Sequence, residues 1–471
     1  MGQIMAATDK KLKVDNNKQL FLWALTSALA GFLFGFDTVV ISGAEKTIQS
    51  LWGLSASLHG LAISAALWGT VLGAMLGGWP TDRFGRVKTL ISIGLLYFVS
   101  AIWSALANDP YSFMVARFIG GLGVGVSTVV APLYISEISP AARRGQLTGL
   151  FQFNIVFGIL IAFISNALLG GVGENAWRWM LAVEAVPAII YCLLCFSLPE
   201  SPRWLIGKAK KINEGKTVLS QINTQMSPQE IEAMGNEILA ASNVKGVKSA
   251  FWRSRLSYPI MLAILIAFFN QLSGINAILY FSPRIFEMTG LGQEAALIQS
   301  AGIGITNLVA TFIGLLLIDR IGRRTLLYIG SFGYILALGA CSWAFANEVF
   351  VIVPFCIFLF IAAHAIGQGA VIWVFIAEIF PTEHRSTGQS LGCFIHWIFA
   401  ALLTLFFPMV VTLFSPSYVF GFFCLMMLLQ LIWVFFMVPE TKGIPLEALQ
   451  KKLGIAKLQN NDEIKQEIKA L

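Results

Sequence analysis

The chain has 471 residues, of which 57% are hydrophobic and only 12% are charged, and its formal net charge is +7. Soluble domains carry about 25% charged residues, so the composition excludes an ordinary soluble protein and indicates a polytopic membrane protein. The apolar runs are long and continuous, which favours helices, because the strands of a membrane barrel alternate in hydrophobicity. We therefore expect an all-α membrane protein with the lipid bilayer as a partner.

The apolar runs predict twelve membrane-spanning helices, because roughly 20 apolar residues cross a bilayer as a helix. The first six are expected near residues 20–43, 58–80, 88–107, 111–133, 147–169 and 178–198. The last six are expected near residues 258–287, 296–318, 325–346, 350–379, 389–412 and 417–438.

These spans divide the chain into an N-terminal segment 1–19, a six-helix bundle 20–199, a linker 200–256, a second six-helix bundle 257–438 and a tail 439–471. The linker is rich in lysine and glutamate, which is typical of short amphipathic surface helices. Residues 460–471 carry charges of both signs and are expected to be helical or frayed. The first 20 residues are polar, so we expect no cleavable signal peptide.

The basic residues fall almost entirely in one set of alternate loops, the exceptions being Lys46, Arg117, Arg178 and Arg284. Such a bias places these loops in the cytoplasm, so both termini are expected there. The same placement argues against nucleic acid as a partner. No Asn-x-Ser/Thr sequon occurs in the chain, which favours a bacterial inner membrane over a glycosylated surface.

The two bundles repeat one another in three motifs. Asp-Arg-Phe-Gly-Arg at 82–86 returns as Asp-Arg-Ile-Gly-Arg at 319–323. Likewise, Glu-Ile-Ser-Pro begins at Glu137 and Glu-Ile-Phe-Pro at Glu378, and Pro-Glu-Ser contains Glu200 where Pro-Glu-Thr contains Glu440. Each motif recurs after about 240 residues, so the bundles are two copies of one fold.

Taken together, these motifs resemble those of the sugar porters of the major facilitator superfamily. The resemblance covers roughly residues 20 to 445, and it also rests on Pro-Glu-Ser-Pro-Arg-Trp-Leu at 199–205, Gln-Leu-Ser-Gly-Ile-Asn at 271–276 and Pro-Glu-Thr-Lys-Gly at 439–443. It implies the major facilitator fold, two bundles with the substrate between them near the middle of the membrane, and alternating access.

A run of amide side chains at 270–276 lies inside an apolar span, where such groups are expensive unless they face protein, water or a ligand. The Ser-Gly pair within it is a place where a helix can bend or unwind. Amides suit sugar hydroxyls, but they also join membrane helices by hydrogen bonds. By resemblance, family binding positions are occupied by Gln152, Gln271, Asn276 and Trp373. Further candidates for substrate binding are Asn270, His396, His364 and Asn307.

Two departures from the family pattern bear on the sugar. Asn270 replaces the first glutamine of the usual pair, and His396 stands where glucose and xylose carriers usually have an amide. The mammalian fructose carrier has histidines at the places matching His396 and His364, yet it lacks the tryptophan that Trp373 retains. The sequence therefore leaves three substrates open: fructose, glucose or another hexose, and a pentose.

Three ionisable residues in the first bundle indicate that transport is coupled to protons. Asp37 lies in the first span, Arg117 in the fourth and Glu184 in the sixth. A carboxylate inside the membrane needs a cation or a proton. In the sugar–proton symporters that this chain resembles, an aspartate pairs with the matching arginine, whereas facilitative relatives have asparagine. The resemblance implies that Asp37 binds the proton, that protonation releases Arg117, and that Glu184 modulates the pair. The alternative is a static ion pair.

Repeated charges on the cytoplasmic side form a third group. The resemblance implies that they make salt-bridge networks which hold the outward-facing state and break on inward opening. The alternative is that they only anchor the topology. The candidate gating residues are Asp82, Arg83, Arg86, Glu137, Arg144 and Glu200 in the first half and Asp319, Arg320, Arg323, Glu378, Arg385 and Glu440 in the second.

The sequence thus predicts a monosaccharide transporter of the hexose type, fructose or glucose, that works by alternating access with proton symport. Passive facilitation and a non-transporting sugar sensor are the alternatives. No enzymatic nucleophile–base pair or metal cluster is recognisable, so we expect no catalytic site, metal or cofactor. We expect a functional monomer.

Overall fold

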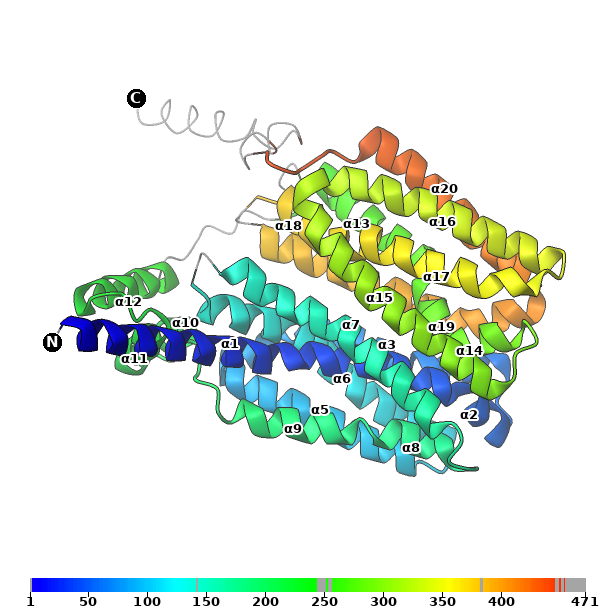
Figure 1. Cartoon of the computed structure of the whole chain (residues 1–471), viewed down its shortest axis with the longest axis horizontal. Coiled ribbons are helices and arrows are strands. Elements are labelled where there is room, and N and C mark those ends of the chain that lie inside the picture. The colour runs from blue at the N-terminus through cyan, green and yellow to red at the C-terminus, as the bar shows by residue number, and fades with distance from the viewer. Residues whose placement is uncertain are drawn as a thin grey trace. The chain divides into compact units, whose positions relative to one another are not determined.

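The computed structural model describes residues 2–140, 143–243, 251–252, 256–381, 384–444, 449 and 453, with only the backbone of 2–17, 144–145, 241 and 243. Within these residues every regular element is a helix (Figure 1). Twelve helical stretches of this described part are long and apolar enough to cross a membrane. The predicted all-α fold class with twelve spans is confirmed. The tail segment 460–471 lies outside the described residues.

The chain divides into two compact units, Met1–Gly53 with Ala65–Gly246, and Leu54–Ser64 with Val247–Leu471. The first unit contains α1 (Gly2–Val40), η1 (Ile41–Gly43), α2 (Glu45–Leu51), most of α3 (Ala56–Leu76), α4 (Gly78–Phe84), α5 (Arg86–Leu106), α6 (Pro110–Ile138), α7 (Arg144–Leu169), α8 (Ala176–Ala182), α9 (Ala185–Cys195), α10 (Pro202–Gly207), α11 (Ile212–Ile222) and α12 (Pro228–Asn243). The short helices α10, α11 and α12 confirm the predicted helical linker.

The second unit begins with the start of α3 and continues beyond the linker. Its elements are α13 (Ser257–Leu272), α14 (Ile275–Glu287), α15 (Gln293–Ile321), α16 (Arg323–Ala346), η2 (Phe350–Ile352), α17 (Val353–His364), η3 (Ala365–Gly369), α18 (Ala370–Ile379), α19 (Arg385–Leu413) and α20 (Pro416–Met437).

Three predicted spans are interrupted. The break between α13 and α14 lies at Ser273 and Gly274, where the sequence predicted one. The tenth span passes through η3, one stretch of π-helix, and the sixth divides into α8 and α9; neither break was predicted. By contrast, α1 is longer than the predicted span, because it begins at Gly2 and the span was expected to begin near residue 20.

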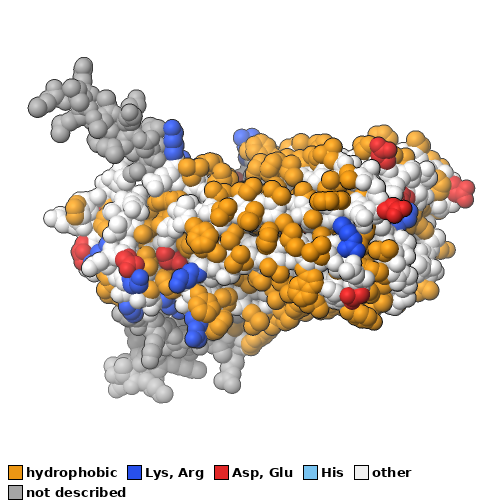
Figure 2. Space-filling view, turned by 90° about the horizontal axis from the view of Figure 1, so that it is seen from below, with side chains coloured by type: hydrophobic (Ala, Val, Ile, Leu, Met, Phe, Trp, Pro, Cys, Tyr) orange, Lys and Arg blue, Asp and Glu red, His pale blue; other side chains and the backbone are white. Residues whose placement is uncertain are grey.

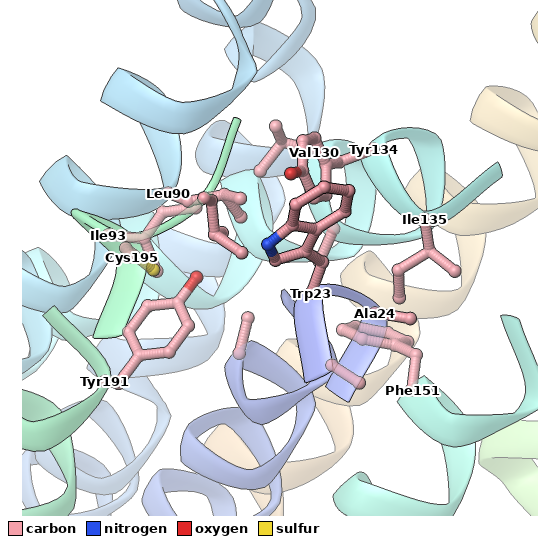
Figure 3. Packing of buried hydrophobic residues seen from close by; sticks show 14 of the residues in the cluster. Trp23, Ala24, Leu90, Ile93, Val130, Tyr134, Ile135, Phe151, Tyr191 and Cys195 are labelled. Atoms are coloured by element: carbon pink, nitrogen blue, oxygen red, sulfur yellow. The ribbon is translucent and has the colours of Figure 1, made fainter. Parts of the chain in front are cut away.

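The core of the first unit brings α1, α5, α6, α7 and α9 together. Figure 3 shows Trp23 among side chains from these helices, including Val130, Tyr134 and Tyr191. Glycines permit the closest approaches: a Cβ at Gly35 would lie 1.9 Å from the carbonyl oxygen of Ile155 on α7. The glycines of α6 act in the same way, because a Cβ at Gly121 would lie 1.8 Å from the carbonyl oxygen of Ala66. Small residues at helix interfaces are the usual means of tight packing in membranes.

The outer surface is apolar where a membrane would contact it. On the face shown in Figure 2, hydrophobic side chains cover the middle and charged side chains gather toward the two ends. The exposed side chains of α9 include Val186, Ile190 and Leu193, and that of its C-cap residue Phe196 is exposed as well. A soluble protein rarely exposes such continuous apolar area, so these residues face lipid.

Candidate functional site

The amide cluster of the second unit is positioned by the break between α13 and α14. Gly274 has φ +89°, a left-handed conformation that favours glycine, and a Cβ there would lie 2.7 Å from the ring of Phe423. Ser273 Oγ donates to the carbonyl of Asn270 at 2.7 Å, and the backbone N–H of Ile275 donates to the same hydroxyl at 3.3 Å. The chain therefore changes direction here without leaving these backbone groups unsatisfied.

Gln271 lies at the centre of the amide cluster. Its Nε2 donates to Asn270 Oδ1 at 3.0 Å, and its Oε1 accepts from Asn276 Nδ2 at 2.7 Å. His396 of α19 lies on the other side, with a ring nitrogen 3.1 Å from Gln271 Nε2. Donors and acceptors of neighbouring residues thus converge on one amide, which suits recognition of hydroxyl groups.

An aromatic surface adjoins these amides. The ring of Trp373 on α18 lies 5.0 Å from that of His396, centroid to centroid, and both side chains are half-buried. An indole face can pack against the apolar C–H face of a sugar ring. The predicted residues Asn270, Gln271 and Trp373 are therefore joined into one cluster through His396.

Three other candidates for substrate binding have other partners or belong to the first unit. The Oδ1 of Asn307 on α15 accepts from Thr311 at 3.3 Å. His364, at the end of α17, has its Nδ1 2.6 Å from Tyr334 Oη. Gln152 lies on α7 in the first unit and is half-buried. Their roles toward a sugar stay predictions.

An ion pair is buried in the first unit. Arg117 Nη1 lies 2.5 Å from Asp37 Oδ1, and Arg117 Nη2 donates to the backbone carbonyl of Asp37 at 3.0 Å. Both side chains are at most 2% exposed. Burial of this kind makes the charge on each partner depend strongly on the other, because losing one leaves an uncompensated charge in a medium of low dielectric constant.

Glu184 completes the ion pair as a third ionisable group, because it interacts electrostatically with both Asp37 and Arg117. It lies at the junction of α8 and α9, and it is 2% exposed. The junction follows from Pro187, which lacks the N–H that would bond to the carbonyl of Val183; the N–H of Val186 bonds there instead. The structure thus brings the three predicted proton-coupling residues together.

The first charged network joins α5, α6 and the start of the linker. Arg86 forms a bidentate pair with Glu137, with two N···O distances of 2.9 Å, and its Nη1 lies 3.4 Å from Asp82 Oδ1. Glu200 accepts from the backbone N–H of Arg86 at 2.9 Å and from that of Val87 at 3.2 Å. A carboxylate at the first N–H groups of a helix is favourable for the helix dipole, so Glu200 fixes the linker to the start of α5.

The second unit repeats this network almost bond for bond. Arg323 pairs with Glu378 at 2.8 and 3.1 Å and with Asp319 at 3.1 Å. Glu440 accepts from the backbone N–H groups of Arg323 and Arg324, both at 3.0 Å. The repeat predicted from the sequence is therefore a repeat of geometry.

The two capping carboxylates differ in their acidity. Burial raises the pKa of Glu200, although hydrogen bonds from the backbone of Ser201, Arg86 and Val87 act against it. Burial also acts to raise the pKa of Glu440, but four backbone N–H groups outweigh it and hold that pKa below the ordinary value. The pKa values of the two carboxylates therefore depart from the ordinary value in opposite directions, and Glu200 is the more easily protonated of the two.

The remaining gating candidates lie at the margins of these networks. Arg83 lies over the ring of Trp79, with 5.4 Å from Cζ to the ring centroid. The side chains of Arg320 and Arg385 are exposed. The side chain of Arg144 lies outside the described part of the chain.

Comparison with known proteins agrees with this architecture. The sequence model of the family described as "Sugar (and other) transporter" matches residues 23–453. The chain belongs to this family. It is therefore a multi-pass membrane transporter and not an enzyme, and its fold is the major facilitator fold.

Several relatives of this transporter come from bacteria. The Arabinose-proton symporter of Bacillus subtilis is 35% identical over 441 residues, which are 92% of this chain and 94% of the relative. The D-xylose-proton symporter of Escherichia coli is 30% identical over 483 aligned positions, with 92% of this chain and 96% of the relative covered. A solved inward-open structure of the E. coli xylose transporter has a TM-score of 0.81 and 29% identity, and covers 92% of this chain and 99% of that one.

One polar network of this transporter was not predicted from the sequence. Gln368, within the π-helical stretch η3, donates to Gln430 Oε1 at 2.8 Å, and Gln430 donates to Ser331 Oγ at 2.8 Å. All three side chains are fully buried. Glutamines inside the apolar tenth and twelfth spans were the available signal, since a buried amide requires partners.

Proposed function

We propose that this chain imports a monosaccharide together with a proton across a bacterial inner membrane, with both termini in the cytoplasm. The observation that carries the proposal is the buried cluster of Asp37, Arg117 and Glu184 within a member of the sugar transporter family. Relatives named as arabinose–proton and xylose–proton symporters support the coupling.

The coupling step follows from the ion pair. While Asp37 is ionised, its carboxylate holds Arg117 Nη1 at 2.5 Å. A proton on Asp37 removes the charge that compensates Arg117, and the guanidinium then turns toward Glu184, the second carboxylate with which it interacts. A change of partner between two helices is a two-state element of the kind that alternating access requires.

Sugar recognition is assigned to the amide cluster with Trp373 and His396, together with Gln152, Asn307 and His364. Gln271 already carries bonds on both amide atoms. A sugar hydroxyl that replaced one of these partners would therefore exchange one hydrogen bond for another at little net cost.

The two charged networks are assigned to gating. Arg86 and Arg323 each hold a carboxylate in bidentate geometry and each belongs to a network that fixes one helix start. Bidentate pairs are geometrically specific, so a small displacement of the helices breaks both bonds together.

An aldose, either a pentose or glucose, is our first choice of substrate, because relatives are named for arabinose, xylose and glucose transport. Fructose is the second candidate. His396 beside the amides favours it, but His364, the other histidine behind that assignment, is engaged with Tyr334.

The test is uptake of labelled arabinose, xylose, glucose and fructose into energised vesicles, with and without a protonophore. Accumulation of one sugar above its external concentration, lost with the protonophore, is the expected result. Equilibration of the sugar at a rate that the protonophore does not change would instead indicate a passive facilitator. Binding without uptake would indicate a sensor. Asn154→Ala serves as a control for amide substitutions, because Asn154 Nδ2 donates within its own helix, to the carbonyl of Leu150.

A further inference from the structure

Several buried oxygen atoms of the first unit lack a hydrogen-bond partner among the described residues, and three of them are Ser100 Oγ, Ser104 Oγ and Glu184 Oε1. Their residues are at most 2% exposed. An unsatisfied buried polar atom costs roughly 1–3 kcal/mol, and in most proteins a water molecule supplies the missing bond.

The two serines lie on one face of α5, four residues apart, which places one a single turn above the other. Tyr97 begins the same row and interacts electrostatically with Asp37 and Glu184. This face meets α6 at Gly120, where a Cβ would lie 2.4 Å from Ser100 Oγ and 3.7 Å from Asp37 Oδ1. The two oxygens therefore approach the same point beside the Gly120 backbone, and a water molecule that bridges them is what the route proposed below requires.

The other end of the row leads to the surface. Ser104 lies in the last turn of α5, which ends at Leu106. Arg178 Nη1 donates to the carbonyls of Ala105 and Ala107 at 2.6 and 2.9 Å, and its Nη2 donates to Asn108 Oδ1 at 3.0 Å. Asn108 is exposed. A polar row thus runs from the buried ion pair to the end of α5 that the charge pattern assigns to the outside.

We propose that Ser100 and Ser104 line a hydrated route along which protons pass between the outer end of α5 and Asp37. Each hydroxyl holds a water molecule of the route, and each water accepts a proton from its outer neighbour and gives one to its inner neighbour, so every water is restored. The proton ends on the carboxylate of Asp37. The inference rests on the proposed proton symport.

The charged and titratable groups that face this route come from all four elements around it. Asp37 belongs to α1, Arg117 to α6, Tyr97 to α5 and Glu184 to the junction of α8 and α9. The serines act as positioning residues for water.

The test compares net uptake with exchange in vesicles that contain the full-length protein. Net uptake driven by a pH gradient requires protons to reach Asp37, whereas exchange of labelled for unlabelled sugar at equal pH does not. We expect Ser100→Ala and Ser104→Ala to lower the initial rate of protonophore-sensitive uptake at least tenfold and to leave the exchange rate within twofold. Ser104→Thr, which keeps the hydroxyl, should restore uptake.

Ser27→Ala is the matched control, because Ser27 is equally buried but donates to the carbonyl of Ala131. Unchanged uptake in both serine variants would overturn the proposed route and leave symport intact. An equal loss of uptake and exchange would also overturn it, since that result denotes a structural role. If the unsubstituted protein shows no protonophore-sensitive uptake, symport itself fails, and the route fails with it. If Ser100→Ala does not fold, Ser104→Ala decides alone.

Discussion

Replacing Asp37 with asparagine tests the coupling most directly. The change keeps an oxygen that can accept from Arg117 Nη1, and the bond from Arg117 Nη2 to the backbone carbonyl at 3.0 Å does not depend on the side chain. A hydrogen bond to a charged partner contributes about 1.5–3 kcal/mol and a neutral one about 0.5–1.5 kcal/mol. The change also removes the charge that compensates the buried guanidinium, which by itself costs about 3–5 kcal/mol, and the Glu184 carboxylate, which also interacts with Arg117, offsets part of this loss.

The loss of function should be much larger. A membrane potential of about 100 mV supplies about 2.3 kcal/mol for each proton. Since about 1.4 kcal/mol corresponds to a factor of ten, one proton per sugar supports roughly fiftyfold accumulation. An asparagine side chain does not bind a proton at physiological pH. The Asp37→Asn variant should therefore bring the internal and external sugar concentrations to a ratio of one.

The assay measures steady-state accumulation of labelled sugar in energised vesicles, together with exchange at equal pH. Exchange should persist in the variant. Glu45→Gln is the matched control, since Glu45 is another buried carboxylate of the same unit and should keep accumulation. Protonophore-sensitive accumulation by Asp37→Asn would refute the reasoning and make the ion pair a structural one.

Four further results are expected. Gln271→Leu should raise the KM for exchange at least tenfold, because it removes both bonds that join Asn270 and Asn276; an unchanged KM would remove the amide cluster from the sugar site. Arg86→Lys should lower the maximal rate of uptake with little change in sugar affinity, since lysine cannot make the bidentate pair with Glu137; a proportional loss of binding would contradict gating. Gly274→Ala should lower the Tm measured in detergent, because φ is +89° and Phe423 fills the space for a Cβ. The backbone hydrogen bonds lower the pKa of Glu440, so its contribution to stability is present above the ordinary carboxyl pKa and is lost as the pH falls through the lower folded value. Glu440→Gln should therefore flatten the acid side of the Tm–pH profile. An unaltered profile would contradict this role of Glu440 in stability.

The twelve spans and the internal repeat could be predicted because each depends on local sequence. An apolar run of sufficient length must be helical in a membrane, and a motif such as that ending in Arg86 recurs intact at Arg323. The break at Gly274 was also predictable, because a Ser-Gly pair beside amides weakens a helix. The bonds of Glu200 and Glu440 to helix starts needed the structure, since each partner lies more than a hundred residues away.

The candidate site was predicted in its residue types but not in its grouping. That Gln271 faces His396 depends on the relative rotation of α13 and α19, which no local pattern reveals. His364 illustrates the same point, because its partner Tyr334 lies on another helix and carries no sequence signal of its own. The division of the sixth span at Glu184 could have been predicted from Pro187, three residues beyond it.

The carboxylate caps have a consequence for the order of synthesis. Glu200 is 114 residues beyond the backbone N–H that it accepts from, and Glu440 is 117 residues beyond its own. At roughly 5–20 residues per second, a ribosome needs about 6–23 s to deliver each carboxylate after the helix start has emerged. During that interval the ribosome synthesises all the remaining spans of the bundle, and the helix start lacks this carboxylate. Each half is therefore completed by a segment that is synthesised after its last span.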